Sequence, residues 1–211
     1  MPKEIFQEKQ KRALRILKHL MKAYPNAGIQ LNFATPMQLL AAVIMSAQAT
    51  DNHVNNVTDK LFKKYKDVDD FADANIRTFQ SEIKSINFYK TKGKNVVNSA
   101  RIIRDDYKGR IPNDINELVK LPGVARKTGN IVQYRLYGKA EGIPVDTHVK
   151  RVARKLKLTN HIAPNKIEQD LMKLYHQLNW GMIAYYFQEY GRNASPARGK
   201  PKDNDPLEGL Y

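Results

Sequence analysis

The apolar residues of this chain recur mainly at three- and four-residue steps, which is the spacing of one face of an α-helix. Near the N-terminus the apolar positions that follow this spacing are Ala13, Leu14, Leu17, Met21 and Tyr24. Pro25 interrupts the pattern, because proline cannot continue a helix. The sequence therefore predicts an amphipathic N-terminal helix whose apolar stripe packs against another element.

A second helix is expected to begin after Thr35. Threonine is a favourable N-cap and Pro36 suits the first helical position, and a nearly continuous apolar run follows over residues 39–47. A helix that is apolar on all sides is usually buried, so this one is expected in the core. Breakers separate further helical patterns at about 51–66, 75–85, 90–107, 114–120, 126–137, 147–157, 164–177 and 182–191. No convincing alternating strand or internal repeat is present, so the predicted fold is all-α.

The charge of the chain indicates the kind of partner. Among 211 residues, 36 Lys and Arg stand against 21 Asp and Glu, which gives a formal net charge of +15. Such an excess favours a polyanion, and nucleic acid is the first candidate, because neutralising phosphates releases counterions. The longest apolar run is about half the roughly 20 residues of a membrane span. The charged N-terminus lacks the apolar core of a signal peptide, so we expect a cytoplasmic protein, nucleoid-associated in a prokaryote, without a membrane partner.

The chain has no cysteine, which excludes disulfides, thiolate metal sites and cysteine nucleophiles. His19, His53, His161 and His176 lack the spacing of metal ligands, and no metal site is predicted.

The most informative stretch is a predicted helical hairpin at about 114–137. A short amphipathic helix ends at Leu121, Pro122 and Gly123 form a tight turn, and a second helix begins almost at once. The backbone N–H groups of Gly123, Val124 and Ala125 would then face outward at a helix N-terminus, where the macrodipole favours an anion. A DNA phosphate fits this geometry, although an ordinary αα-turn that only reverses the chain is the alternative.

Two cations follow the turn. Arg126 and Lys127 occupy the first turn of the second helix, where positive charge opposes the helix dipole. This placement is more favourable if they face an anion, although isolated basic residues are usually solvated.

Residues 121–127 resemble the helix-hairpin-helix of the DNA glycosylase superfamily, and Arg-Lys-Thr at 126–128 resembles its endonuclease III branch. Residues 144–152 are similar to that family's Val-Asp-Thr-His box, and residues 45–51 to its Leu-Ser-Ala-Gln-Ala-Thr-Asp segment. Weaker matches at 86–89 and 190–192 extend the resemblance over nearly the whole chain.

The resemblance implies a bifunctional DNA glycosylase and abasic-site lyase of base excision repair that removes oxidised pyrimidines. Lys127 would be the nucleophile: its amine attacks the sugar C1′, expels the base and leaves a Schiff base, through which β-elimination cuts the strand. Only an uncharged amine attacks, and Arg126, Arg151 and the helix N-terminus would favour that form. Asp146 would stabilise positive charge on the sugar and activate the amine; alternatively, it only caps the helix after it.

Such an enzyme turns the damaged base out of the duplex, so a side chain must fill the hole while a wedge parts the stack. By resemblance, Gln48 fills the hole and Phe88 or Tyr89 is the wedge. Alternatively, Gln48 is only a polar residue at a helix end and Phe88 is an ordinary core aromatic. Asp51 and His148 match positions of the base pocket, although both residue types often cap helices. Further DNA contacts are expected at Leu121, Gly123, Val124, Ala125, Arg126, Thr128, Lys150 and Arg151, and at the basic run 90–94 and Arg154.

The resemblance also implies two lobes with double-stranded DNA, carrying damaged or abasic sites, in the cleft between them. A six-helix barrel-like domain would span residues 29–139 and include the helix-hairpin-helix, and residues 1–28 with 140–211 would form the second lobe. Lys127 and Asp146 would lie on opposite lips, and the protein would be a monomer. The sequence departs from the family pattern at Asn87 and Ala125, where glycine is usual, and at Gly129, where alanine is usual.

Many relatives end in four cysteines, C-x6-C-x2-C-x5-C, which hold a [4Fe-4S] cluster. In this chain the four places fall on Ser195, Lys202, Asp205 and Tyr211, so the cluster is predicted to be absent. The cluster-less tail over residues 193–211 either frays or packs through apolar and aromatic residues, namely Tyr190, Pro196, Pro206, Leu207, Leu210 and Tyr211.

Two rival functions are left open. A monofunctional glycosylase for adenine or for mismatched thymine or uracil would generally lack the nucleophilic lysine. The presence of Lys127 therefore argues against this function. A non-catalytic DNA-binding protein would retain only the hairpin, and the presence of Gln48 and Asp146 as well as Lys127 argues against it.

Overall fold

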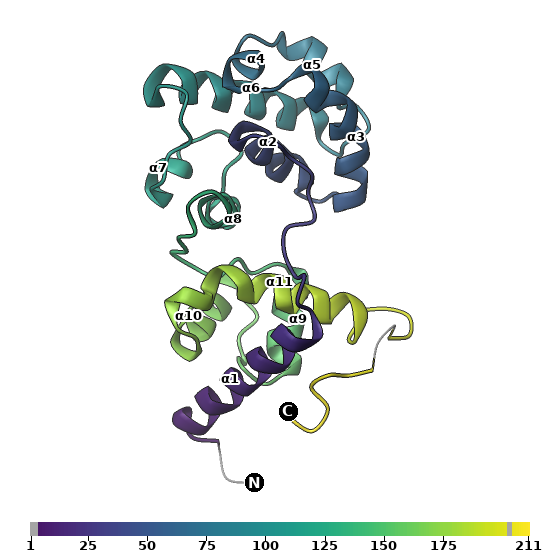
Figure 1. The fold of residues 1–211 in the computed structure, drawn as a ribbon, viewed down its shortest axis with the longest axis vertical. Coiled ribbons are helices and arrows are strands. Elements are labelled where there is room, and N and C mark those ends of the chain that lie inside the picture. Colours follow the sequence, from purple (N-terminus) through teal and green to yellow (C-terminus); the bar gives the residue numbers. More distant parts are fainter. Residues whose placement is uncertain (1–3, 202–203) are drawn as a thin grey trace. The chain divides into compact units, whose positions relative to one another are not determined.

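The computed structural model describes residues 4–201 and 204–211. Within these ranges the regular secondary structure consists of eleven α-helices, without a strand (Figure 1). The all-α prediction is therefore confirmed. None of the helices in the described ranges is long and apolar enough to cross a membrane.

The chain divides into two compact units. One is formed by residues 30–138 and contains α2 (Pro36–Ser46), α3 (Asp51–Lys64), α4 (Val68–Ala72), α5 (Ile76–Glu82), α6 (Tyr89–Tyr107), α7 (Ile115–Leu118) and α8 (Arg126–Tyr137). The other is formed by residues 1–29 and 139–211 and contains α1 (Phe6–Ala23), α9 (Thr147–Lys155), α10 (Pro164–Leu174) and α11 (Gln177–Asn193).

Helix α2 forms the centre of the unit of residues 30–138. Thr35 caps it by accepting a hydrogen bond from the Gln38 N–H at 3.3 Å, and Pro36 occupies the first turn. Every residue from Met37 to Met45 is buried, and α3, α6 and α8 pack against the helix. The expectation of a buried helix is therefore confirmed.

Helix α4 was not predicted from the sequence. Its five residues follow a cap by Asp67, whose side chain accepts from the Asp70 N–H at 3.1 Å. Arg101 of α6 donates to the carbonyls of Ala72 and Ala74 and so satisfies the end of α4. A helix this short depends on such tertiary contacts rather than on its own periodicity.

The apolar stripe that α1 buries consists partly of other residues than the sequence predicts. Leu14 and Met21 are exposed, and the buried face consists of Ala13, Ile16, Leu17 and Leu20. Several apolar residues at helical spacing allowed two overlapping stripes, and packing against α10 and α11 selects the one that contains Ile16 and Leu20. The helix stops at Ala23, before Pro25, as the sequence predicts.

Candidate functional site

The predicted hairpin is formed by α7, a tight turn and α8. Gly123 adopts a φ of 80° in this turn, and a Cβ atom there would lie 2.8 Å from the Asn95 Nδ2 atom. Both the backbone conformation and the close approach of Asn95 therefore require glycine. Ser99 donates to the Pro122 carbonyl at 2.9 Å and fixes the start of the turn on α6.

Two residues expected to contact DNA are buried in the hairpin. Leu121 and Val124 are 2% and 5% exposed, so their side chains belong to the core of the unit. The Val124 N–H, expected to face an anion, instead donates to the Leu121 carbonyl at 3.1 Å. The expectation for the Val124 N–H is therefore corrected, whereas a DNA contact by the backbone of Leu121 stays a prediction. The turn presents Gly123 and Ala125 outward, and both are exposed.

Helix α8 begins at Arg126, and its N-cap residue Ala125 offers no side-chain acceptor. Arg126 and Lys127 are exposed on the first turn, and Thr128 is half-buried. Gly129 lies against α7, where an added Cβ would come within 2.6 Å of Ile115 Cδ1. The departure from alanine at Gly129 thus coincides with a close approach of the two hairpin helices, and Lys127 lies at the helix start that follows the turn.

Asp146 precedes α9, and both of its carboxylate oxygens accept hydrogen bonds. Oδ1 accepts from the Val149 N–H at 2.8 Å, which is the predicted N-cap. Oδ2 accepts from Gln188 Nε2 of α11, also at 2.8 Å. Gln188 was missed by the sequence analysis, because no local pattern connects two residues that are so distant in the chain. Its amide fixes the rotation of the carboxylate.

Other predicted residues lie on α9. His148 and Lys150 are half-buried on its first turn. Arg151 Nη2 donates to the carbonyls of Gly191 and Ser195 at 2.6 and 2.8 Å. Arg151 therefore ties α9 to the end of α11, and its contact with a DNA phosphate stays a prediction.

In the unit of residues 30–138, two loops carry the residues predicted to enter the duplex. Gln48 is exposed after the end of α2, and Phe88 is 64% exposed immediately before α6. The alternative that Phe88 is a core aromatic is wrong. Tyr89 is half-buried in the first turn of α6, so Phe88 is the better candidate of the two for the predicted wedge. Asp51 is half-buried at the start of α3.

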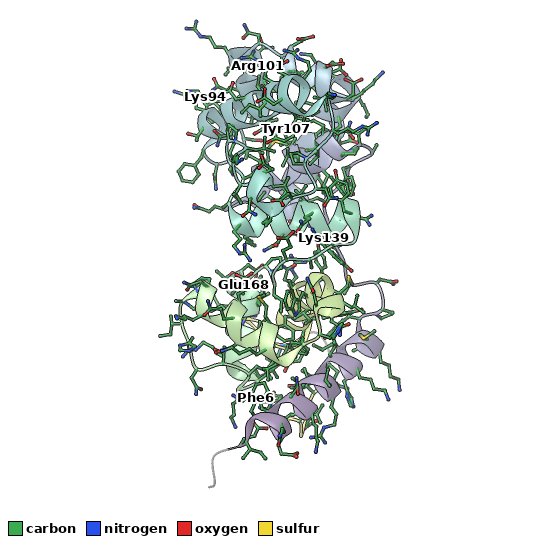
Figure 2. The ribbon with its side chains drawn as sticks, turned by 90° about the vertical axis from the view of Figure 1, so that its left-hand side faces the viewer. Phe6, Lys94, Arg101, Tyr107, Lys139 and Glu168 are labelled. Carbon is green, nitrogen blue, oxygen red and sulfur yellow. The ribbon has the colours of Figure 1, made fainter. Side chains whose placement is uncertain are left out.

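The basic run 90–94 was expected to contact phosphates. Lys90 and Lys94 are exposed, and Lys94 extends from the surface of α6 (Figure 2). Lys92 is different, since it is only 6% exposed and its Nζ donates to the carbonyls of Met45 and Ala47. Burial lowers the pKa of Lys92. Its expected phosphate contact is therefore corrected to a role in holding the end of α2.

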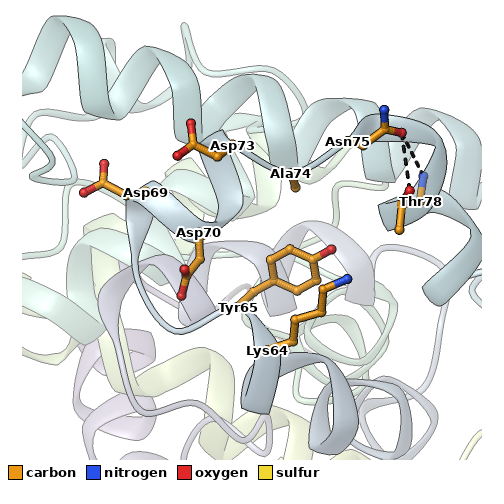
Figure 3. A pocket seen from close by; sticks show the side chains of 8 residues that line it. All are labelled: Lys64, Tyr65, Asp69, Asp70, Asp73, Ala74, Asn75 and Thr78. Atoms are coloured by element: carbon orange, nitrogen blue, oxygen red, sulfur yellow. Dashed lines mark hydrogen bonds between the residues drawn. The ribbon is translucent and has the colours of Figure 1, made fainter.

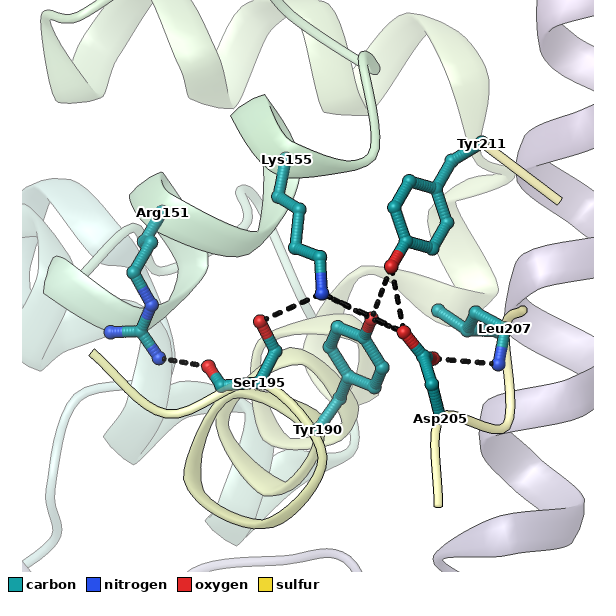
Figure 4. A network of polar contacts seen from close by, with 7 residues as sticks. All are labelled: Arg151, Lys155, Tyr190, Ser195, Asp205, Leu207 and Tyr211. Atoms are coloured by element: carbon teal, nitrogen blue, oxygen red, sulfur yellow. Dashed lines mark hydrogen bonds and ion pairs between the residues drawn. The ribbon is translucent and has the colours of Figure 1, made fainter. Parts of the chain in front are cut away.

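The tail is held by the polar network of Figure 4. Asp205 accepts hydrogen bonds from the Tyr190 hydroxyl at 2.9 Å, the Tyr211 hydroxyl at 2.6 Å and the Leu207 N–H at 2.9 Å. Lys155 of α9 lies 3.6 Å from the same carboxylate and donates to the hydroxyls of Tyr190 and Ser195. Tyr190 and Leu207 are fully buried. The described part of the tail is thus ordered by this network, which is here called the tail network.

The residues of the tail network can be compared with the ligands that an iron–sulfur cluster requires. Of the four places in the family frame, Lys202 lies outside the described residues, and the other three carry a hydroxyl, a carboxylate and a phenol. Ser195, Asp205 and Tyr211 all take part in the tail network. These residues do not fit a cluster that requires thiolate ligands.

A surface pocket of about 460 Å³ lies on the same unit as the hairpin, over α4 and the start of α5 (Figure 3). Its lining consists of Lys64, Tyr65, Asp69, Asp70, Asp73, Ala74, Asn75 and Thr78. Three carboxylates against one ammonium disfavour a phosphate, so the pocket is not a candidate for binding the DNA backbone.

The hairpin presents exposed residues and two cations at a helix N-terminus without a side-chain cap, an arrangement that suits an anion such as a DNA phosphate. Residues 41–177 match the family model described as "HhH-GPD superfamily base excision DNA repair protein". The chain is 42% identical to endonuclease III of Synechocystis sp. over 90% of this chain and 87% of that protein. It is 39% identical to endonuclease III of Bacillus subtilis over 89% of this chain and 85% of that protein.

The solved structure of a trapped endonuclease III–DNA covalent intermediate superposes on this chain with a TM-score of 0.83 at 34% identity, covering 90% of each chain. The chain therefore belongs to the HhH-GPD superfamily and, within it, to the endonuclease III family.

Proposed function

We propose that the protein is a bifunctional DNA glycosylase and abasic-site lyase that removes oxidised pyrimidines from double-stranded DNA in base excision repair. The observation that carries this proposal is the placement of Lys127. It lies exposed in the first turn of α8, directly after the hairpin turn, in a family whose member endonuclease III has been trapped as a covalent intermediate with DNA.

In this proposal the Lys127 amine attacks C1′ of the damaged nucleotide, and the bond between C1′ and the base breaks. The resulting Schiff base allows β-elimination of the 3′ phosphate. Asp146, held by Val149 and Gln188, stabilises the positive charge that develops on the sugar and accepts a proton from the amine. Gly123, Ala125 and Arg126 bind the phosphate backbone at the N-terminus of α8.

Borohydride trapping tests the nucleophile. Borohydride reduces a Schiff base to a stable amine, so wild-type protein should become cross-linked to a duplex with an abasic site, whereas the Lys127→Ala variant should not. Lys120→Ala is the matched control, because Lys120 is also an exposed hairpin lysine and pairs with Glu117 at 2.7 Å. An equal adduct from Lys127→Ala would refute the assignment.

Excision and binding assays on duplexes that still carry a damaged or mismatched base separate the rival functions. Base release without strand cleavage or adduct would indicate a monofunctional glycosylase, and tight binding without turnover would indicate a non-catalytic DNA-binding protein. A panel of duplexes with oxidised pyrimidines, mismatched thymine and uracil identifies the substrate.

We further propose that the protein holds no iron–sulfur cluster. The absence of cysteine from the sequence and the engagement of Ser195, Asp205 and Tyr211 in the tail network support this. Stoichiometric iron together with acid-labile sulfide in protein purified without oxygen would refute it.

A further inference from the structure

Two neighbouring loops of the unit of residues 30–138 contain residues in the left-handed region of backbone conformation. Gln48 has a φ of 57° and Phe88 a φ of 60°. Residues with a Cβ atom rarely adopt this conformation, and it persists where surrounding contacts enforce it. These two exposed residues are also those proposed to fill the hole in the duplex and to part the stack.

Side chains from the loop of Phe88 and from α6 donate hydrogen bonds to the loop of Gln48 and to the end of α2. Asn87 Nδ2 donates to the Gln48 carbonyl at 3.1 Å. Lys92 Nζ donates to the carbonyls of Met45 and Ala47 at 2.9 and 2.5 Å, at the end of α2. The ammonium group thus satisfies carbonyls that the last turn of a helix leaves without partners.

A third link joins the start of α3 to the loop before Phe88. The imidazole Nε2 of His53 donates to the Ser85 carbonyl at 3.0 Å. The loop of Gln48 lies between α2 and α3, so it is connected to α6 through Lys92 at one end, and to the loop of Phe88 through His53 at the other end and through the Gln48 carbonyl.

Asn87 is the link that departs from the family pattern described in the sequence analysis. The family pattern has glycine at this position, and a glycine has no side chain with which to reach the Gln48 carbonyl. The hydrogen bond is made by the residue directly before the wedge, to the backbone of the residue that fills the hole. This hydrogen bond therefore links the position of one loop to that of the other.

We infer that Asn87 is a positioning residue for base flipping: its side chain couples the loops of Gln48 and Phe88, so that both enter the duplex as one preformed element. The inference rests on the proposed glycosylase function and on the roles of Gln48 and Phe88 within it. Preformed geometry accelerates a reaction because less ordering remains to be done on the way to the transition state.

The test compares Asn87→Ala with wild-type protein in single-turnover excision of an oxidised pyrimidine. Loss of one neutral hydrogen bond predicts about a three- to tenfold slower excision. Stopped-flow fluorescence of 2-aminopurine beside the lesion should show base opening slowed by a similar factor. Asn56→Ala, an exposed asparagine of α3, is the control and should leave both rates unchanged.

A double-mutant cycle separates positioning from general damage to the fold. Gln48→Ala keeps the backbone carbonyl that Asn87 binds but removes one of the two side chains to be positioned, so adding Asn87→Ala in that background should slow excision less than it does in wild-type protein. Equal losses in both backgrounds would refute the coupling.

Failure of the inference is distinguishable from failure of the proposed function. If wild-type protein forms no borohydride adduct on an abasic duplex, the function is wrong and the inference falls with it. If the adduct forms and Asn87→Ala opens and excises the base at the wild-type rate, only the inference is refuted.

Discussion

Gln188 Nε2 donates a hydrogen bond of 2.8 Å to Asp146 Oδ2, and this contact orients a carboxylate whose other oxygen already caps α9. A carboxylate that caps a helix with one oxygen and accepts a hydrogen bond from a side-chain amide with the other is held in one orientation. The two interpretations of Asp146 that the sequence left open are therefore compatible, since capping positions the group that the proposed chemistry uses.

Substitution of Gln188 by alanine should slow excision without weakening DNA binding. The freed carboxylate would spend less time in the productive orientation, and hydrogen bonds to charged groups contribute about 1.5–3 kcal/mol. We expect a rate about tenfold lower in single-turnover assays, with an unchanged dissociation constant for an abasic duplex. The exposed Gln169→Ala on α10 serves as control; an unaltered rate in Gln188→Ala would remove Gln188 from the site.

DNA affinity should fall steeply with salt, because the chain carries a formal charge of +15. Each phosphate contact contributes about 0.9 to the slope of log affinity against log salt concentration. Arg126→Ala should reduce that slope by about 0.9, as measured by fluorescence anisotropy between 50 and 200 mM salt. Lys63→Ala should not, because Lys63 lies on α3 and pairs with Asp59. A slope unchanged in Arg126→Ala would contradict the phosphate contact.

The tail network should open in acid. Burial alone raises the pKa of Asp205, but the hydrogen bonds from Tyr211, Leu207 and Tyr190 outweigh it and hold the pKa below its ordinary value. A carboxyl group with a lowered pKa stabilises the folded tail above its unfolded pKa of about 3.9, and this contribution is lost as the pH falls through the folded pKa. Hydrogen exchange should therefore show tail protection at pH 5 to 7 that declines below about pH 4.

Asp205→Asn provides the control for that measurement. An amide in place of the carboxylate cannot titrate and accepts fewer hydrogen bonds, so the tail should exchange faster at neutral pH and show little further change in acid. A tail that is equally protected in both proteins would mean that other contacts order it.

Gly129→Ala tests the contact between the hairpin helices. Alanine gains about 1 kcal/mol of helix propensity over glycine, but the new Cβ would meet Ile115 Cδ1 at 2.6 Å. Because the terminal methyl of Ile115 can move, we expect a net change in the free energy of unfolding of less than about 1 kcal/mol. In combination with Ile115→Val, which removes that methyl, the gain should be larger than the sum of the single effects, as measured by urea denaturation.

The helix content and the position of the main motifs were predictable from the sequence because they depend on local signals. Thr35 with Pro36 marks the start of α2, and the proline–glycine turn marks the hairpin. Helix α4 was missed because Asp67 and Arg101 stabilise a segment too short to show periodicity.

Side-chain roles were less predictable. Lys92 resembles its neighbours in the basic run, and only the three-dimensional structure shows that its amine lies beside the end of α2. Leu121 and Val124 belong to the motif for which phosphate binding is proposed, and the motif does not reveal that their side chains face the core. Gln188 reaches Asp146 from another helix, which no spacing rule indicates.

The composition of the tail network has a consequence for the assembly of the protein. Phenol, carboxylate and ammonium groups are supplied by the polypeptide itself, so, if the protein holds no cluster as proposed, a segment held by these groups needs no delivery of iron or sulfide to fold. Such a segment is also insensitive to the oxidants that dismantle iron–sulfur centres. A repair protein built in this way would keep its structure under the oxidative conditions that damage DNA bases.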